Sequence, residues 1–344
     1  MESSIRKVGL VRSNRVVVIG ASSGGLEALR SLVTNLPTDF PAPICVVLHT
    51  SPQSPAILAD ILSRSGRLPA HNARDRERLT PGHVFVAPPD RHLLIEPGMV
   101  RVSKGPRENR FRPAIDPLFR TAAQVYGPGA IGVLLTGNLD DGTAGLWTIK
   151  QLGGLAVVQD PADAMFSSMP ASAIAHVRVD YVVPLSEIPD LLVNLASQPL
   201  EAALGDTPPE SLEVEVRIVK EHNPLDAGLL GVAEPSSFAC PECHGVLLQL
   251  QEGGRLRFRC HTGHAYSMDS LLAAIAEGIE DTLWSAIRAL EEGGLLLNTV
   301  ADHIEAFHDG HQSGQLRTRA DEARRQSEAL RKLVSEREAV PTQS

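Results

Sequence analysis

The sequence predicts an α/β fold: a doubly wound, mostly parallel sheet, followed by a small cysteine-rich module and C-terminal helices. Over residues 15–195, apolar runs of strand length alternate with amphipathic helical patterns, as in a parallel sheet covered by helices on both faces. Three of the four cysteines cluster with histidines after residue 238, and a helical apolar pattern begins at residue 271. One large sheet domain and a smaller C-terminal part are therefore expected.

The first buried strand, at residues 15–19, runs into the turn at residues 20–25 and then into a helical pattern. A strand that turns on glycines into a helix lifts one side chain above the carboxyl edge of the sheet, and here it is the hydroxyl of Ser22. Backbone N–H groups of this turn are placed to stabilise an oxyanion. Three interpretations of Ser22 remain open: a helix N-cap, part of a phosphate-binding loop, or a nucleophile that needs a base and an acid.

Polar residues also follow the next two buried strands. The run at residues 44–48 ends at His49, and the run at residues 131–135 leads into a turn that contains Asp140 and Asp141. Because parallel strands end at a common edge, a serine, a histidine and an aspartate are expected to meet there. An imidazole, with its ordinary pKa of ~6.5, suits proton transfer, and a carboxylate can orient it. A structural histidine and an aspartate that caps the next helix are the alternatives.

Three short apolar runs lie between these strands, at residues 83–87, 93–95 and 99–102. Pro-Asp and Pro-Gly turns join them, so we expect an antiparallel extension of the sheet. The loop at residues 104–112 that follows is rich in cations. It is either a solvated loop or a surface for an acidic partner.

The motifs of the large domain follow one another as Val18-Ile-Gly-Ala-Ser22-Ser-Gly-Gly, Leu48-His49, Val84-Phe-Val-Ala-Pro-Pro-Asp-Arg-His92, Pro113-Ala-Ile-Asp116-Pro-Leu-Phe119, Leu135-Thr-Gly, Asp141-Gly142, Gln159-Asp-Pro161 and Met169-Pro170. In these motifs, residues 14–195 resemble the catalytic domain of the CheB-type chemotaxis protein-glutamate methylesterases. The resemblance implies that Ser22 is the nucleophile and His49 the base. It also implies that Asp141, rather than Asp140, orients the base, and that catalysis needs no cofactor.

The chain departs from the family pattern at two places. The chemotaxis enzymes usually have Met-Gly where this chain has Asn138-Leu139, and often His-Met-Pro where this chain continues from His49 with Thr50 and Ser51. The three residues of the expected triad are retained, so we expect hydrolysis to be retained as well. Leu139 replaces a flexible glycine beside the acid, and the geometry of the oxyanion or substrate pocket is expected to differ.

The resemblance implies that the protein removes γ-methyl esters from glutamates of a methyl-accepting chemoreceptor, with glutamine deamidation as a second activity. Two alternatives stay open: a non-catalytic, receptor-binding scaffold, and an esterase for small molecules. Chemotaxis members usually carry an N-terminal receiver that covers the active site. Because the first strand begins near Arg15, we expect no receiver here, and activity without a phosphodonor unless the C-terminal module covers the site.

Composition narrows the choice of compartment and partner. The chain has 344 residues, 43% of them apolar, and a net charge of −9, which argues against nucleic acid as the main partner. No apolar run approaches the ~20 residues that a membrane span needs, and the N-terminus lacks a secretory h-region. Four cysteines suit a reducing compartment. A cytoplasmic protein without membrane insertion is expected.

The cysteine-rich segment has the spacing of a small zinc ribbon. Cys240-Pro-Glu-Cys243 is followed, after sixteen residues, by Cys260 and then His264, so that a hairpin would bring two pairs of ligands around a tetrahedral ion. A redox C-x-x-C motif is the alternative. The spacing leaves His264, His261 and His244 open as the fourth ligand, and the resemblance to methylesterase-like proteins with this extension favours His264. One structural zinc, remote from the chemistry, is expected.

The expected boundaries are an N-terminal tail (1–14), the methylesterase domain (15–197), a linker (198–237), the zinc-ribbon-like module (238–266) and a helical tail (267–338). The linker is rich in Pro, Glu, Gly and Asp, but residues 212–219 alternate like a strand. We expect the helices of the tail to pack together, and a docking surface for other signalling proteins is the alternative.

Overall fold

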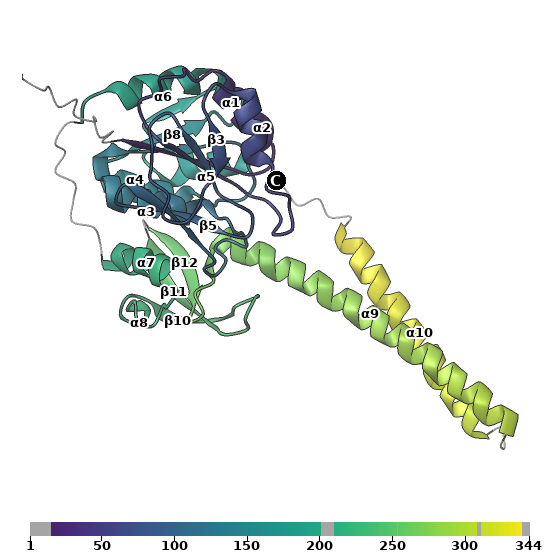
Figure 1. Cartoon of the computed structure of the whole chain (residues 1–344). Helices are drawn as coiled ribbons and strands as arrows, with labels where there is room; N and C mark the ends of the chain where they lie inside the picture. Colours follow the sequence, from purple (N-terminus) through teal and green to yellow (C-terminus); the bar gives the residue numbers. More distant parts are fainter. Residues whose placement is uncertain (1–14, 201–209, 253, 308–310, 339–344) are drawn as a thin grey trace, which may run out of the picture. The chain divides into compact units, whose positions relative to one another are not determined.

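The computed structural model describes residues 15–200, 210–252, 254–307 and 311–338, so the expected N-terminal tail lies outside it. The described residues belong to two compact units that divide at Leu271. The first holds the large sheet domain and the cysteine-rich module, and the second consists of helices (Figure 1).

A seven-stranded sheet forms the centre of the first unit, with the strand order β3-β4-β2-β1-β7-β8-β9. Every neighbouring pair is parallel, which confirms the predicted sheet. The strands are β1 (Val16–Ala21), β2 (Ile44–Leu48), β3 (Ala70–Asn72), β4 (Val84–Val86), β7 (Ala130–Leu134), β8 (Leu155–Gln159) and β9 (Tyr181–Val183).

Helices cover both faces of this sheet, and β1 has buried apolar side chains on both faces. Val17 and Ile19 belong to one buried cluster, whereas Val16 and Val18 belong to another, because successive side chains of a strand point to opposite faces. The first cluster is covered by α1 (Gly25–Thr34), α2 (Leu58–Ser65) and α6 (Ile188–Ser197). The second is covered by α3 (Ile115–Tyr126), α4 (Thr143–Gln151) and α5 (Ser168–His176).

The expected antiparallel extension is only partly correct. β4, from the first of its three runs, is instead a parallel strand of the main sheet, between β3 and β2. All three of its residues are buried, which suits an interior strand covered on both faces. The other two runs form a separate antiparallel pair, β5 (His92–Glu96) and β6 (Met99–Ser103).

The strand-like alternation at residues 212–219 does not correspond to a strand. The segment belongs to the helix α7 (Glu210–Glu221). Its apolar residues also recur at three- and four-residue spacing, and both Val214 and Ile218 are buried. They pack with Leu229, at the start of α8 (Leu229–Val232), and with Leu248. The expected linker, 198–237, thus contains two helices among its described residues.

An antiparallel sheet follows, with the order β10-β11-β12-β13. We refer to residues 234–267, which contain it, as the cysteine-rich module. Its strands are β10 (Glu234–Ala239), β11 (Val246–Glu252), β12 (Arg255–Cys260) and β13 (Ala265–Ser267).

The predicted C-terminal helices are α9 (Met268–Phe307), which begins in the first unit, and α10 (His311–Glu338). Arg331 binds Glu291, and Arg317 binds Asp302. Because the later residue of α10 pairs with the earlier residue of α9, the two helices form an antiparallel hairpin. In the described part of the chain, no helix has the length and apolar character needed to span a membrane.

Candidate active site

Ser22 lies in the turn between β1 and α1. Gly24, with φ 73°, adopts the left-handed conformation that glycine tolerates, and it ends the turn just before the helix. The backbone N–H of Ser22 donates to the carbonyl of Thr136, 3.0 Å away, and the Ser22 carbonyl accepts from Gly25 at 2.8 Å. The turn after β1 is therefore fixed against the turn after β7.

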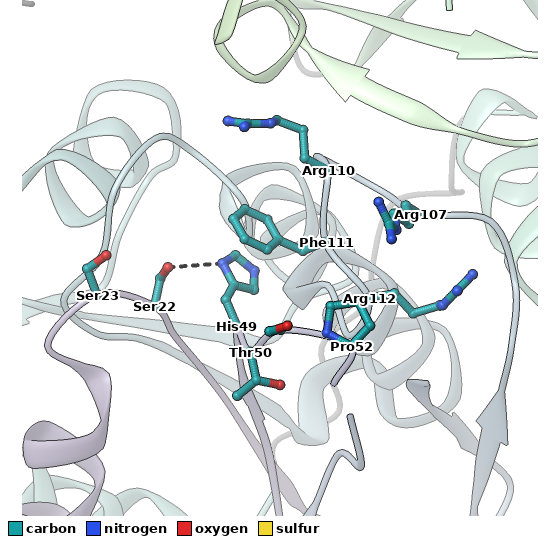
Figure 2. A pocket seen from close by; sticks show the side chains of 10 residues that line it. Ser22, Ser23, His49, Thr50, Pro52, Arg107, Arg110, Phe111 and Arg112 are labelled. Carbon is teal, nitrogen blue, oxygen red and sulfur yellow. Dashed lines mark hydrogen bonds between the residues drawn. The ribbon is translucent and has the colours of Figure 1, made fainter. Parts of the chain in front are cut away.

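His49 follows β2 and joins the other two candidate residues. Its Nδ1 lies 3.0 Å from the Oγ of Ser22, and its Nε2 lies 2.7 Å from Oδ2 of Asp141. Figure 2 shows the imidazole between the serine and the loop that carries Phe111, whose ring stacks on it at 3.7 Å between centroids. The ring is thus held at both nitrogens and on one face, with Nδ1 facing the hydroxyl.

Asp141 is buried and surrounded by donors. Besides His49, its carboxylate accepts from the side-chain amide of Asn109 at 2.7 Å and from the backbone N–H of Ile115 at 2.7 Å. Burial alone would raise the pKa of Asp141, but the hydrogen bond and charge of His49, together with these N–H donors, hold the pKa below its usual value. Asp141 is therefore suited to remain ionised beside the imidazole.

The neighbouring Asp140 has different partners. It binds the guanidinium of Arg255 and accepts a hydrogen bond of 2.6 Å from the hydroxyl of Ser267, both in the cysteine-rich module. The structure thus brings Ser22, His49 and Asp141 together, and directs Asp140 elsewhere.

A cleft of about 460 Å³ opens beside the serine and the histidine. Arg107, Arg110 and Arg112 come from one loop, and Figure 2 shows them on the same side of the site as Phe111. Arg112 is held by Asp90 at 2.8 Å. The residues that line the cleft are Ser22, Ser23, His49, Thr50, Ser51, Pro52, Arg107, Arg110, Phe111 and Arg112.

The family model of the CheB methylesterases matches residues 17–192, the segment that contains the sheet, the candidate triad and the cleft. The chain belongs to this family. A solved CheB methylesterase catalytic domain, from Thermotoga maritima, is 38% identical, with a TM-score of 0.51, and the match covers 54% of this chain and 100% of that one.

Among curated CheB relatives, a Leptospira interrogans protein (serogroup Icterohaemorrhagiae, serovar copenhageni) is 44% identical over 186 residues, which are 54% of this chain and 96% of that protein. An Anaeromyxobacter dehalogenans protein, named protein-glutamate methylesterase/protein-glutamine glutaminase 2, is 44% identical over 52% of this chain and 53% of its own length. The cysteine-rich module lies beyond the residues that the family model matches.

The structure also describes the turn at which the sequence departs from the family pattern. Leu139, at the position of the usual glycine, has φ 62°, a left-handed conformation that costs a residue with a Cβ some strain. The preceding Asn138 donates from its side chain to the hydroxyl of Ser23 at 3.2 Å. Leu139 thus adopts a backbone conformation that glycine would adopt without strain.

Two residues at this site were not singled out in the sequence: Phe111, which stacks on His49, and Asn109, which binds Asp141. Both lie in the loop at residues 104–112, which the sequence marks only as rich in cations. No local sequence pattern marks either residue, because His49 and Asp141, which they contact, lie far from them along the chain.

A second group of functional candidates, three cysteines and one histidine, lies in the cysteine-rich module. The ligand atoms of Cys240, Cys243, Cys260 and His264 all lie within 4.8 Å of one another. Ligands about 2.3 Å from a tetrahedral zinc stand about 3.8 Å apart, and the distance between the sulfurs of Cys243 and Cys260 is 3.6 Å. All three cysteines are free thiols. Of the three candidate histidines, the structure places His264 in this cluster, so the donor set fits a closed zinc site.

Proposed function

We propose that this chain is a protein-glutamate methylesterase of the CheB type, in which Ser22, His49 and Asp141 form the catalytic triad. The observation that carries the proposal is the unbroken relay from hydroxyl to imidazole to carboxylate, with links of 3.0 and 2.7 Å. Such a relay activates a serine for attack on an acyl carbon.

The reaction follows from the orientation of the ring. His49 donates its Nε2–H to Asp141, which leaves Nδ1 free to take the proton of Ser22 as its Oγ attacks the ester carbonyl. Backbone N–H groups near Ser22 and in the Asn138 turn stabilise the oxyanion. Collapse expels methanol, which takes the proton from Nδ1. Water, deprotonated by the same nitrogen, then releases the glutamate. A glutamine amide would lose ammonia by the same steps, without a cofactor.

We propose a methyl-accepting chemoreceptor as the substrate protein. The arginines of the 104–112 loop line the cleft beside the serine, and their positive charge suits a protein segment rich in glutamate. A neutral small-molecule ester would gain nothing from these cations. This charge is the feature that favours a protein substrate over a small ester.

The decisive experiment measures methanol released from a methylated chemoreceptor by the full chain. Ser22→Ala and His49→Ala are expected to abolish the release without unfolding the protein, which circular dichroism checks. Release that survives Ser22→Ala would refute the assignment of the nucleophile. No release from receptor by the parent chain, with turnover of small esters, would identify a small-molecule esterase. A chain inert toward both that still binds receptor would be a scaffold.

We further propose that Cys240, Cys243, Cys260 and His264 hold one structural zinc. The ion would supply folding free energy to a module too small to bury a sufficient core. Purified protein should contain about one zinc per chain, as expected for a four-ligand site. Cys243→Ser should lose it, whereas His261→Ala, the matched control, should keep it. A disulfide between the two cysteines of the C-x-x-C motif would overturn this proposal.

A cytoplasmic location and additional signalling partners complete the proposal. Three reduced zinc ligands persist best in a reducing compartment. On α9, the apolar side chains of Leu295 and Leu296 are exposed, which supports a docking role for the helical hairpin.

A further inference from the structure

Asn109 lies between the cysteine-rich module and Asp141, with 1% of its surface exposed. Its Nδ2 donates to Oδ1 of Asp141 at 2.7 Å and to Oδ2 of Asp116 at 2.9 Å. Its Oδ1 accepts from the backbone N–H of Ser267 at 3.0 Å and from the hydroxyl of Ser270 at 3.3 Å. One side chain thus connects the carboxylate of the candidate triad to the end of β13.

The backbone of the same loop is also held by β13. The N–H of Asn109 donates to the carbonyl of Ala265 at 2.8 Å, and the N–H of Ala265 donates back to the carbonyl of Arg107 at 3.2 Å. Asn109 has φ 49°, a left-handed conformation that asparagine tolerates but does not favour. Two residues later, Phe111 stacks on His49. The module therefore fixes a loop that contacts two members of the triad.

Buried ion pairs attach the module to the large domain. Arg120, which is fully buried, lies 2.8 Å from Glu108 and 3.3 Å from Glu252. Arg259 lies 2.8 Å from Glu108, and Arg257 lies 2.8 Å from Asp116. Glu108 and Asp116 belong to the large domain, so β12 and the end of β11 are anchored on both sides of Asn109. Removing one partner of such pairs leaves an uncompensated buried charge.

The metal-ligand cluster lies at the end of this anchored strand. Cys260 ends β12, two positions after Phe258 and directly after Arg259, and His264 immediately precedes β13. The N–H of Cys260 donates to the carbonyl of His264 at 3.0 Å. The ligands therefore close the turn that presents Ala265 to the loop. The sequence predicted a zinc remote from the chemistry, but a short chain of contacts joins its ligands to Asp141.

We propose that Asn109 is a positioning residue for the His49–Asp141 pair, and that zinc in the cysteine-rich module keeps it in place. The proposal rests on the proposed esterase function. By donating to Oδ1, Asn109 adds a side-chain restraint to the backbone N–H groups that hold the Asp141 carboxylate, and so helps to keep Oδ2 facing Nε2 of His49. When the module loosens, the side-chain oxygen of Asn109 loses its two donors, Ser267 and Ser270. The Asp141 carboxylate is then held less firmly, mainly by the backbone N–H groups of Ile115 and Gly142.

The test uses the full chain, zinc-loaded and after removal of zinc with a chelator. Zinc removal should lower kcat on methylated receptor by about tenfold to a hundredfold, the cost of a small misplacement of reacting groups. KM should rise as well, because Arg107, Arg110 and Arg112 of the loosened loop line the cleft. Independently of activity, amide hydrogen exchange at residues 107–112 should accelerate. Returning zinc should restore both.

Substitutions then distinguish a loss of kcat that acts through Asn109 from a general loss of structure. Asn109→Ala should lower kcat to a similar extent while retaining zinc, and zinc removal should lower its kcat by a smaller factor than in the parent chain. Asn109→Leu, which has a similar shape but no hydrogen-bonding group, should behave alike. Asn35→Ala, whose side chain bonds only within its own helix, should respond to zinc as the parent does.

Three outcomes would overturn the proposal: an unchanged kcat on zinc removal, an effect confined to KM, or losses from Asn109→Ala and zinc removal that multiply. The rate at which a fluorophosphonate labels Ser22 is measured in parallel. A zinc-dependent labelling rate in a chain that releases no methanol from receptor would refute the proposed substrate and leave the role of Asn109 standing.

Discussion

Asp140 and Asp141 are adjacent but bind different partners. Replacing each with asparagine tests how these partners affect catalysis and stability. Asp141→Asn cannot hold the tautomer that donates from Nε2, so kcat should fall by roughly 10⁴, as expected when a triad loses its acid. Asp140→Asn weakens the bonds to Arg255 and Ser267. It should cost about 1–3 kcal/mol of stability and far less activity. Methanol release and urea unfolding measure the two effects, and a larger kcat loss for Asp140→Asn would reverse the assignment.

Buried carboxylates also predict how stability depends on pH. Burial alone would raise the pKa values of Glu108 and Glu215, but the charge of Arg259 and then of Arg120 holds both below the usual value; Asp141 is lowered as well. Their stabilisation is complete above the unfolded pKa of about 4 and is lost as pH falls through the lower folded values. Burial and the charge of Asp141 raise the pKa of Asp116 to about 6. Asp116 therefore destabilises the fold above pH about 4, and this penalty reaches its full size above pH about 6.

The free energy of unfolding should consequently fall most steeply below pH about 4, where Asp116 is protonated in both states. Urea midpoints of the cysteine-rich module, followed by hydrogen exchange between pH 3 and 6, provide the measurement. Glu108→Gln should flatten the decline. A midpoint that stays constant down to pH 3 would contradict the depressed pKa values.

At the scale of elements, the turn after β7 limits the position of Ser22. A Cβ on Gly137 would stand 2.8 Å from the Cβ of Ser22 and 2.5 Å from the side chain of Met169. The methionine can move, but Ser22 lies on a turn held at both ends. Gly137→Ala should therefore displace Ser22 and lower kcat by roughly a hundredfold.

Fluorophosphonate labelling of Ser22 and methanol release check this prediction. Gly231→Ala is the matched control, since an added Cβ there meets nothing within 4 Å. Equal kcat in the two variants would show that the turn yields and that the serine is not so constrained.

The elements also show what a sequence can and cannot reveal. The strands that end near Ser22, His49 and Asp141 were predictable, because glycine turns and apolar runs mark them locally. The helix at residues 210–221 was not, since its valines satisfy both a two-residue and a helical repeat. Asn109 was not predictable either. Its partners stand 32 and 158 residues away along the chain, and no local pattern encodes such a contact.

At the scale of the whole molecule, the residue at which a truncated chain ends should decide whether it keeps its stability and kcat. A chain that ends at Ser197 keeps Arg120 and Glu108 but loses Glu252 and Arg259, and it should lose about 3–5 kcal/mol, the cost of breaking a buried pair. The side-chain oxygen of Asn109 also loses its two donors, Ser267 and Ser270, so kcat should fall. A chain that ends at Leu271, the boundary of the first unit, keeps these contacts and should retain stability and kcat.

Urea unfolding and methanol release compare the two truncations with the full chain. Retention of full kcat by the chain that ends at Ser197 would show that the large domain is self-sufficient. It would also support the expectation, from the sequence, that the zinc is remote from the chemistry.

The buried ion-pair network constrains how this protein can have changed during evolution. The large domain contributes Arg120, Glu108 and Asp116, and the later segment contributes two arginines and two glutamates, Arg257, Arg259, Glu215 and Glu252. Three cations thus face four acids, a set that becomes neutral when Asp116 holds a proton. Apolar interfaces accept many partners of similar shape, whereas this one accepts only a partner with matching charges. A recombinant that joins this large domain to a module without these charges would leave buried charges of the large domain without their partners.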